Sequence, residues 1–315
     1  MSNNILVTGG AGFIGSHLIE HYIDSGYLVV VVDDLSSGKE GNLPAEVKFY
    51  RVDVGSQALE EVFAVEKPDW VNHHAAQISV SRSVRFPLND AQINVLGSLN
   101  LLENAVKYKV KKFIFASSGG TVYGGAPSWP ATEDTPFAPL SPYGVAKVAV
   151  ELYLRYYKAQ FGLDYVALRY SNVYGPRQDP HGEAGVIAIF SQAMLSGERP
   201  RLNARRKDGD DGSSRDFVYC RDVARANVLA TESSLTGPYN VGTGVDTTIR
   251  EIFELVAADA GFKGEPIYAP KREGDLEISI LSPNKIENEL GWKPSVSLKE
   301  GIGETVDFFR QRKNK

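Results

Sequence analysis

The chain has 315 residues, of which 43% are hydrophobic, and its formal net charge at pH 7 is −5. This length and apolar content predict one large α/β unit, or one such unit with a small appended lobe. The acidic balance, with no basic run longer than the three residues Arg205 to Lys207, argues against nucleic acid or an anionic membrane as the main partner.

The remaining bulk features are typical of a soluble cytoplasmic protein. Cys220 is the only cysteine, so no intrachain disulfide can form. The first residues lack a basic region, and their apolar run, Ile5 to Val7, is too short for a signal peptide. No stretch approaches the ~18 consecutive apolar residues of a membrane helix. The five histidines show no shared ligand spacing, so we expect no metal site.

The first predicted element is a short apolar strand that runs into a glycine turn and then into a helix from residue 13 to about residue 25. Gly9, Gly12 and Gly15 recur at every third position. Glycine at this spacing allows a tight turn and a close approach of the backbone to a ligand. The free N–H groups at the start of the helix form a site suited to a pyrophosphate. The segment therefore predicts dinucleotide binding.

The second predicted strand, residues 28–32, ends in Asp33-Asp34. An acid at this position of a dinucleotide-binding fold meets the ribose hydroxyls of the adenosine. Two acids with no nearby arginine would repel a 2′-phosphate. We therefore expect NAD rather than NADP as the cofactor.

Strand-like and helix-like segments continue to alternate as far as residue 169. This alternation predicts an α/β fold of the Rossmann type, with a doubly wound parallel sheet covered by helices on both faces. Ligands of such folds bind beyond the carboxyl ends of the strands. The further strands are expected at residues 47–53, 70–73, 112–117 and 164–169, and the helices between them at 57–65, 87–109 and 142–161.

Beyond residue 169 glycine and proline become frequent and the predicted helices shorten to 184–196, 221–231, 248–260 and 298–312. We expect an NAD-binding domain at residues 1–170. Residues 171–315 are expected to form a smaller, substrate-binding lobe, some segments of which return to the first domain. Residues 203–214 are polar and rich in turn formers, which predicts a mobile loop.

Tyr143 and Lys147 are four residues apart in a predicted helix, which places both side chains on one face. A phenol with an ordinary pKa of about 10 is a poor base at neutral pH. A neighbouring ammonium and a nicotinamide cation would favour its phenolate. Such a phenolate could remove a proton from a sugar hydroxyl while a hydride leaves the same carbon.

Several motifs accompany this pair in a characteristic order: residues 8–15, 74–77, Asn94, 117–123, 169–177, 215–219, 240–244 and 272–275. With Tyr143 and Lys147, they resemble the extended short-chain dehydrogenase/reductase family. Within it they are most similar to the UDP-galactose (UDP-glucose) 4-epimerases. The resemblance runs from residue 5 to about residue 309.

The resemblance implies a cofactor site for NAD and a catalytic centre at Tyr143, the base, and Lys147, which binds the nicotinamide ribose and lowers the pKa of Tyr143. Gln77 departs from the pattern, because some epimerases carry a lysine near this position. The implied cofactor contacts are Gly9, Gly12, Phe13, Ile14, Asp33, Asp34, Leu35, Ser36, Asp53, Val54, Ala75, Ala76, Gln77, Asn94, Ser117, Tyr143, Lys147 and Tyr170.

For a UDP-sugar substrate, the resemblance implies contacts from Asn172, Val186, Arg215, Arg272, Asp275 and Ser279. Arginine suits this role because a guanidinium binds phosphate oxygens in a bidentate manner. Arg177 lies in a similar motif, and either a phosphate contact or a solvated surface charge is compatible with it. Ser279 matches a position that is small in epimerases that also accept N-acetylated sugars, so UDP-GlcNAc and UDP-GalNAc are further candidate substrates.

One departure concerns the catalytic centre itself. Many epimerases carry a serine or threonine four residues before Tyr123, where this chain has Gly119. Ser118, Thr121 or a water could supply the missing hydroxyl, and these alternatives stay open. Gly120-Thr121 provides no ionisable group, whereas related dehydratases and decarboxylases carry acids there. Elimination chemistry is therefore not expected.

These features predict a homodimeric, NAD-dependent UDP-hexose 4-epimerase that interconverts UDP-glucose and UDP-galactose. The resemblance implies a dimer formed through the helices at 87–109 and 142–161. One alternative is a sugar-nucleotide reductase or dehydrogenase with net redox change. Another is a non-catalytic, NAD-binding regulatory protein. The hexose preference and the nucleotide base remain open.

Overall fold

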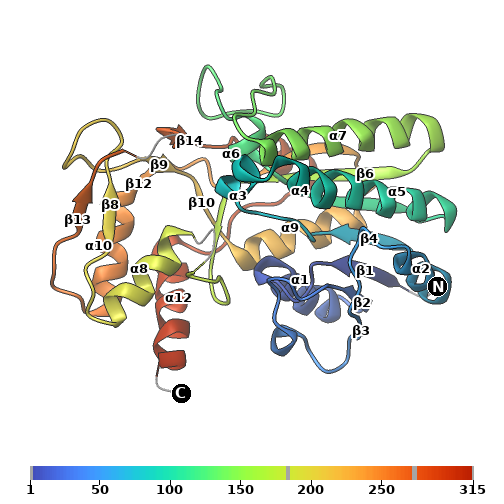
Figure 1. Ribbon diagram of the computed structural model, residues 1–315, viewed down its shortest axis with the longest axis horizontal. Coiled ribbons are helices and arrows are strands. Elements are labelled where there is room, and N and C mark those ends of the chain that lie inside the picture. The colour runs from blue at the N-terminus through green and yellow to red at the C-terminus, as the bar shows by residue number, and fades with distance from the viewer. Residues whose placement is uncertain (1–2, 182–184, 272–274, 314–315) are drawn as a thin grey trace.

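The computed structural model describes residues 3–181, 185–271 and 275–313. Its centre is a seven-stranded parallel sheet with the order β11-β6-β5-β4-β1-β2-β3 (Figure 1). This confirms the predicted doubly wound sheet. The strands are β1 Asn4–Thr8, β2 Leu28–Val32, β3 Lys48–Tyr50, β4 Trp70–His73, β5 Lys112–Ser118, β6 Asp164–Tyr170 and β11 Gly237–Val241.

The central strands are apolar because both of their faces are buried. Ile5, Leu6 and Val7 of β1, for example, are fully buried. The strand order reverses between β1 and β4, and ligands of such sheets bind at this reversal. The glycine loop that follows β1 and the segment that follows β4 therefore lie at the expected binding edge.

Two layers of helices cover the sheet. One face carries α1 (Phe13–Asp24), α9 (Cys220–Glu232) and α11 (Asn284–Leu290). The other carries α2 (Ala58–Glu66), α5 (Gly97–Lys107) and α7 (Pro142–Phe161). Because α9, α11 and β11 come from the second half of the chain, part of that half packs on the first sheet or extends it.

The helix predicted at residues 87–109 is not continuous. It consists of α4 (Pro87–Ala91), a π-helical turn (Gln92–Leu96) and α5, and a further helix, α3 (Val80–Arg85), precedes it. A π turn contains one extra residue and often marks a functional site. Here it contains Asn94, whose side chain is buried.

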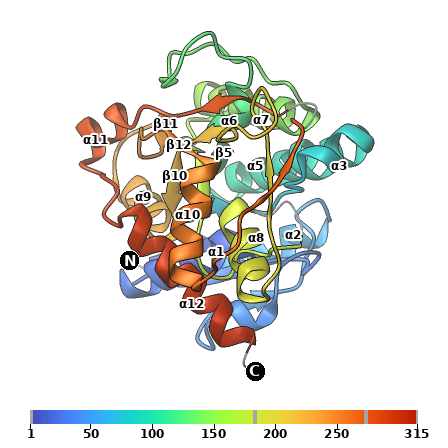
Figure 2. The same cartoon turned by 90° about the vertical axis from the view of Figure 1, so that its left-hand side faces the viewer.

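The smaller lobe is built from α8 (Val186–Leu195), α10 (Ile249–Ala260) and α12 (Leu298–Lys313), which share one apolar core and face the viewer in Figure 2. Three small sheets complete it: β7 Asn172–Tyr174 with β10 Phe217–Tyr219; β8 Arg201–Asn203 with β13 Ile267–Ala269; and β9 Ser214–Arg215 between β12 Thr247–Thr248 and β14 Ile278–Ser279.

Two short helical turns, Glu40–Asn42 and α6 (Gly119–Val122), lie in the first half of the chain. The polar loop at 203–214 is organised by Asp210, whose carboxylate accepts hydrogen bonds from the backbone N–H groups of Arg205, Arg206, Lys207 and Gly212. Within the described ranges, no helix has the length and apolar character needed to cross a membrane.

Candidate active site

The glycine loop is packed too tightly for side chains. Gly9 has φ +67°, and a Cβ there would lie 2.6 Å from the backbone nitrogen of Ala75. A Cβ on Gly15 would lie 2.3 Å from the carbonyl oxygen of Gly9. The loop is therefore closed against both the segment after β4 and the start of α1.

Gly12, by contrast, faces open space. Only the carbonyl oxygen of Gly9, at 3.2 Å, would contact a Cβ there. As the N-cap of α1, Gly12 offers no side chain to its first turn, so the N–H groups of that turn, which begins at Phe13 and Ile14, are not capped by it. Such a helix end attracts an anion, and its geometry fits the pyrophosphate of a dinucleotide.

The acids at the end of β2 brace this loop. Asp33 is 6% exposed; its carboxylate accepts hydrogen bonds from the backbone N–H groups of Ala11 (3.0 Å) and Leu35 (2.8 Å). Burial raises the pKa of Asp33. The carboxylate of Asp34 accepts from the N–H of Ser36 at 2.8 Å. Asp33 thus joins the loop after β2 to the glycine turn, and Asp34 fixes that loop locally.

Asp53 and Val54 follow β3, at the same edge of the sheet. The carboxylate of Asp53 accepts from the N–H of Gly55 at 2.8 Å. Val54 is buried, its carbonyl accepts from the side chain of Asn100 at 2.7 Å, and a Cβ on Gly97 would approach it to 3.0 Å. The structure thus places this pair beside the start of α5.

The segment after β4 is fixed by two polar clusters. The hydroxyl of Thr8 accepts from the N–H groups of His74 and Ala75, each at 3.2 Å. After the half-buried Ala76, the backbone N–H and C=O of Gln77 each bond to the side-chain amide of Asn94 at 2.9 Å.

Asp90, which the sequence analysis missed, completes the second cluster. Its Oδ1 accepts from the side chains of Gln77 (2.8 Å) and Asn94 (2.9 Å). Its place one helical turn before Asn94 is the only sequence signal that could have indicated it.

The start of α7 places the Tyr–Lys pair. Ser141 caps this helix by accepting from the N–H of Gly144 at 3.2 Å, and Pro142 is its first residue. Lys147 is 5% exposed; its ammonium donates to the carbonyl of Ala116 in β5 at 2.7 Å and lies 5.6 Å from the centre of the Tyr143 ring. The two side chains are therefore neighbours at the carboxyl end of β5.

The electrostatics of this pair differ in part from expectation. Burial lowers the pKa of Lys147 to about 8, although the carboxylates of Asp90 and Glu151 oppose the shift. The pKa of Tyr143 is raised, not lowered, by burial and by the charge of Asp90. Burial and Lys147 also lower the pKa of His74 to about 3, so this ring is neutral.

A buried ion pair lies behind the Tyr–Lys pair. Glu151 of α7 accepts from Arg169 of β6, through Nη2 at 2.6 Å and Nε at 3.1 Å, and from the hydroxyl of Ser117 at 2.6 Å. Arg169 also donates to the hydroxyl of Tyr123 at 2.6 Å. The hydroxyl of Ser117, a residue that the resemblance assigns to the cofactor, is thus occupied within the protein.

The hydroxyl of Tyr170, at the end of β6, is also hydrogen-bonded within the protein. Its hydroxyl hydrogen-bonds to Nε2 of His74 at 3.0 Å and accepts from the side chain of Asn227 at 2.8 Å. The rings of Tyr170 and His74 are stacked, with centres 5.9 Å apart. Tyr170 therefore contacts the segment after β4 through both its hydroxyl and its ring.

The space beside Gly119 is filled by a side chain from a distant segment. A Cβ at Gly119 would lie 2.4 Å from Cδ1 of Leu281, a fully buried residue that follows β14. The hydroxyl of Thr121 donates to the carbonyl of Ser118 at 3.3 Å, whereas that of Ser118 makes no hydrogen bond within the described ranges. A Cβ on Gly144 would lie 2.7 Å from the carbonyl of Thr121, so α6 packs directly on the start of α7.

Arg215 and Ser279 face this same region from the smaller lobe. They are aligned in neighbouring strands, and a Cβ on Gly120 would lie 3.3 Å from the hydroxyl of Ser279. Arg215 donates to the carbonyls of Ser214 and Leu276, both at 2.8 Å, and forms no ion pair with any described residue. Burial lowers its pKa, which the charge of Asp275 opposes.

The other residues predicted for the substrate are spread more widely. Asn172 is exposed and donates its N–H to the carbonyl of Asp216 at 2.9 Å, Val186 begins α8, and Asp275 is exposed. Arg272 lies outside the described residues. Arg177 forms an ion pair with Glu20 of α1. Burial would raise the pKa of Glu20, but Arg177 and His17 together hold it near 2.

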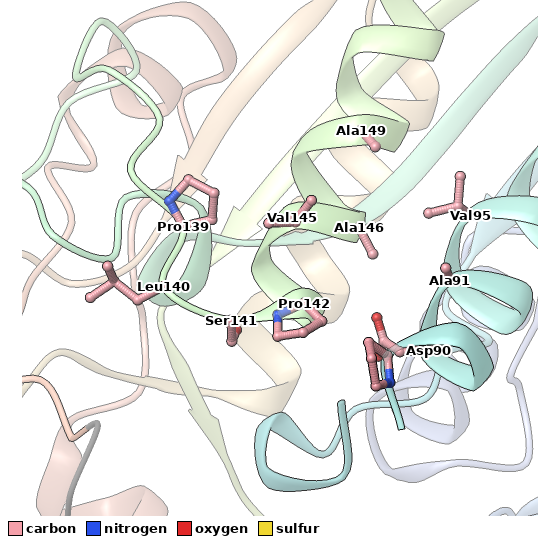
Figure 3. Close-up of a pocket in the computed structure, with 11 residues that line it drawn as sticks. Asp90, Ala91, Val95, Pro139, Leu140, Ser141, Pro142, Val145, Ala146 and Ala149 are labelled. Carbon is pink, nitrogen blue, oxygen red and sulfur yellow. The ribbon is translucent and has the colours of Figure 1, made fainter. Parts of the chain in front are cut away.

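A pocket of about 520 Å³ separates α4 from the start of α7 (Figure 3). Its lining comes from both helices, the π turn and the segment before α7. Asp90 is its only charged lining residue. No cluster of metal-ligating side chains occurs in the part of the chain that the structure describes.

Comparison with known proteins agrees with this geometry. Residues 5–242 match the model of the NAD dependent epimerase/dehydratase family. A UDP-glucose 4-epimerase of Mycolicibacterium smegmatis is 45% identical over 313 residues, which are 98% of this chain and 98% of the relative.

Two solved structures are also similar. The UDP-glucose 4-epimerase of Thermus thermophilus in complex with NAD has a TM-score of 0.93 at 50% identity, over 98% of this chain and 99% of that one. The UDP-N-acetylglucosamine 4-epimerase of Methanobrevibacter ruminantium, in complex with UDP-N-acetylmuramic acid, has a TM-score of 0.93 at 38% identity, over 99% of each. The chain therefore belongs to the NAD dependent epimerase/dehydratase family.

Proposed function

We propose that the protein is an NAD-dependent 4-epimerase of UDP-hexoses, with UDP-glucose and UDP-galactose as its substrates. The observation that carries this proposal is the placement of Tyr143 and Lys147 on one face of α7. They lie at the edge of the sheet where the glycine loop forms an anion site. The similarity to 4-epimerases over nearly the full chain supports it.

In this mechanism Tyr143 removes the proton of the sugar 4-hydroxyl and returns it after inversion. Lys147, held by the carbonyl of Ala116, supplies the positive charge that favours the phenolate and a donor for the nicotinamide ribose. Bound NAD⁺ would supply the hydride acceptor and donor that a reversible oxidation at C4 requires. The first-turn amides of α1 and the acids after β2 would hold the cofactor.

The smaller lobe, which we place beyond residue 170, holds the nucleotide. Arg215 has its charge free of any described acid within ion-pair distance, which suits a diphosphate. Asn172, Val186, Arg272 and Asp275 are proposed to contact the nucleotide beside it. A sugar held only through this diphosphate can turn to present either face to the cofactor, as inversion at C4 requires.

The function is tested by incubating the purified protein with UDP-galactose and identifying the product by NMR. We expect UDP-glucose to appear without a net change in absorbance at 340 nm. Tyr143→Phe, which removes the base but keeps the ring, should lower kcat by about 10²- to 10⁴-fold. If no epimer forms, or if NADH accumulates in step with turnover, the proposal is wrong.

We propose Ser118 as the hydroxyl that hydrogen-bonds to the sugar. It ends β5 next to the start of α7, and its hydroxyl is not engaged by any described residue, whereas the hydroxyl of Thr121 is bonded to the backbone. Gly119 has no side chain, and a larger residue there would have to displace Leu281.

Ser118→Ala should therefore lower kcat about 10²-fold, as expected for loss of a donor to the reacting oxygen. Thr121→Val is the matched control and should leave kcat within about threefold. Adding Gly119→Ser to Ser118→Ala should not restore activity, because the new side chain meets Leu281. A large effect of Thr121→Val with none from Ser118→Ala would reverse the assignment.

Ser279 is proposed to set the width of the sugar site. It is buried beside Gly120 and aligned with Arg215, so it lies between the catalytic centre and the proposed diphosphate contact. A small side chain here leaves room for an acetamido group, and a solved relative with 38% identity is a UDP-N-acetylglucosamine 4-epimerase.

We expect the wild-type protein to epimerise UDP-GalNAc as well as UDP-galactose. Ser279→Tyr should fill the space and lower the ratio of kcat/KM for UDP-GalNAc to that for UDP-galactose at least tenfold. An unchanged ratio in the folded variant would contradict this role.

We propose that two copies of the chain associate through α4, α5 and α7. Large apolar side chains on α7 and on the helices beside it are exposed: Leu88 (87%), Leu152 (54%) and Tyr156 (52%). Such a face is typical of an interface, and a two-fold axis would pair it with itself.

Light scattering of the wild-type protein should give twice the chain mass. Leu152→Glu combined with Tyr156→Glu should give a monomer, because charges would be buried in the apolar contact. The control is Ile267→Glu, at a residue of β13 in the smaller lobe that is 46% exposed. A monomeric wild-type protein would refute the dimer.

A further inference from the structure

Asp90 is the one charged residue in the lining of a mostly apolar pocket. It is 1% exposed and lines the pocket between α4 and α7, where it lies opposite Ala146 (Figure 3). The other residues that line this pocket are apolar or, in Ser141, neutral. Burying a carboxylate in such a wall is costly unless another group compensates its charge.

The hydrogen bonds of Asp90 do not provide that compensation. Oδ1 accepts from the amide groups of Gln77 and Asn94, which are both neutral. Oδ2 is fully buried and has no hydrogen-bond partner in the described structure. No lysine, arginine or histidine of the described residues lies within ion-pair distance.

Lys147 is likewise a buried charged group whose hydrogen-bond partner is neutral. Its ammonium is buried and its hydrogen bond goes to a neutral carbonyl, that of Ala116. Glu151, one turn further along α7, is committed to Arg169 and Ser117. The uncommitted carboxylate of Asp90 and the ammonium of Lys147 thus lie on facing helices, on either side of the place where α4 meets α7.

The titratable groups around them are few. Lys147 is faced by Tyr143 and Glu151 on its own helix, by His73 and His74 at the end of β4, and by Asp90 on α4. The two histidines are neutral because burial and Lys147 lower their pKa values. Asp90 raises the pKa of both Lys147 and Tyr143. Burial raises the pKa of Asp90 itself, an effect that its hydrogen bonds and the charge of Lys147 oppose.

We propose that Asp90 is a positioning residue of the epimerase site, which provides the counter-charge of Lys147 across the α4–α7 contact and fixes Gln77 and Asn94 beside it. The inference rests on the proposed function for its effect on turnover. Its effect on Lys147 itself does not depend on that function.

The consequence of removing the charge has a definite sign. Without Asp90 the charged form of Lys147 loses a favourable interaction, so its pKa falls, and the phenolate of Tyr143 loses an unfavourable one, so its pKa falls too. Both limbs of the pH profile of kcat/KM should therefore move to lower pH. A side chain that merely filled space would change the rate without moving the limbs.

The test is a direct titration of Lys147 by NMR in protein labelled with ¹³C at lysine Cε, with Lys147→Met to assign the signal. We expect a midpoint near pH 8 in the wild-type protein and a fall of about one pH unit in Asp90→Asn. The limb of the kcat/KM profile that follows Lys147 should move by the same amount. Glu60→Gln, which removes an exposed acid on α2, is the control and should leave both unchanged.

Asp90→Ser serves the same purpose if Asp90→Asn does not fold. A folded, neutral variant in which Lys147 titrates as in the wild-type protein would overturn the proposal, whatever its activity. If the wild-type protein forms no epimer, the proposed function fails, and the titration of Lys147 still decides the role of Asp90.

Discussion

The hydrogen bond from the ammonium of Lys147 to the carbonyl of Ala116 is the interaction on which the site depends. A buried ammonium must find an acceptor, and this one fixes the rotation of α7 against β5. Tyr143 lies one turn earlier on the same helix, so the same contact places its ring at the carboxyl end of β5. The ion pair of Glu151 with Arg169 secures α7 one turn further on, against β6.

The site gathers charges that a stable core would avoid. Lys147, Asp90, Glu151 and Arg169 are all nearly buried, and a buried ion pair contributes little net stability compared with apolar packing. Clusters of this kind are typical of catalytic sites, where the environment sets the pKa values that the chemistry requires. The surrounding apolar sheet provides the stability that such a cluster does not.

Much of the fold could be predicted from the sequence because its signals are local. Apolar runs with glycine turns indicated the strands and the NAD loop, and the spacing of Tyr143 and Lys147 indicated one helical face. Contacts between distant segments could not be predicted. The close packing of Leu281 against Gly119 brings together residues that are 162 positions apart in the sequence. The raised pKa of Tyr143 depends on burial and on the charge of Asp90. The π turn at Gln92–Leu96 has no periodicity that separates it from an α-helix.

Inversion at C4 by removal and return of the same hydride leaves an isotopic signature. The most direct measurement uses UDP-galactose deuterated at C4, in ordinary water, with NMR of the UDP-glucose that forms. The deuterium should stay at C4 in the product, because a hydride that is removed and returned within the site does not exchange with solvent. Product that carries solvent hydrogen at C4 would contradict it.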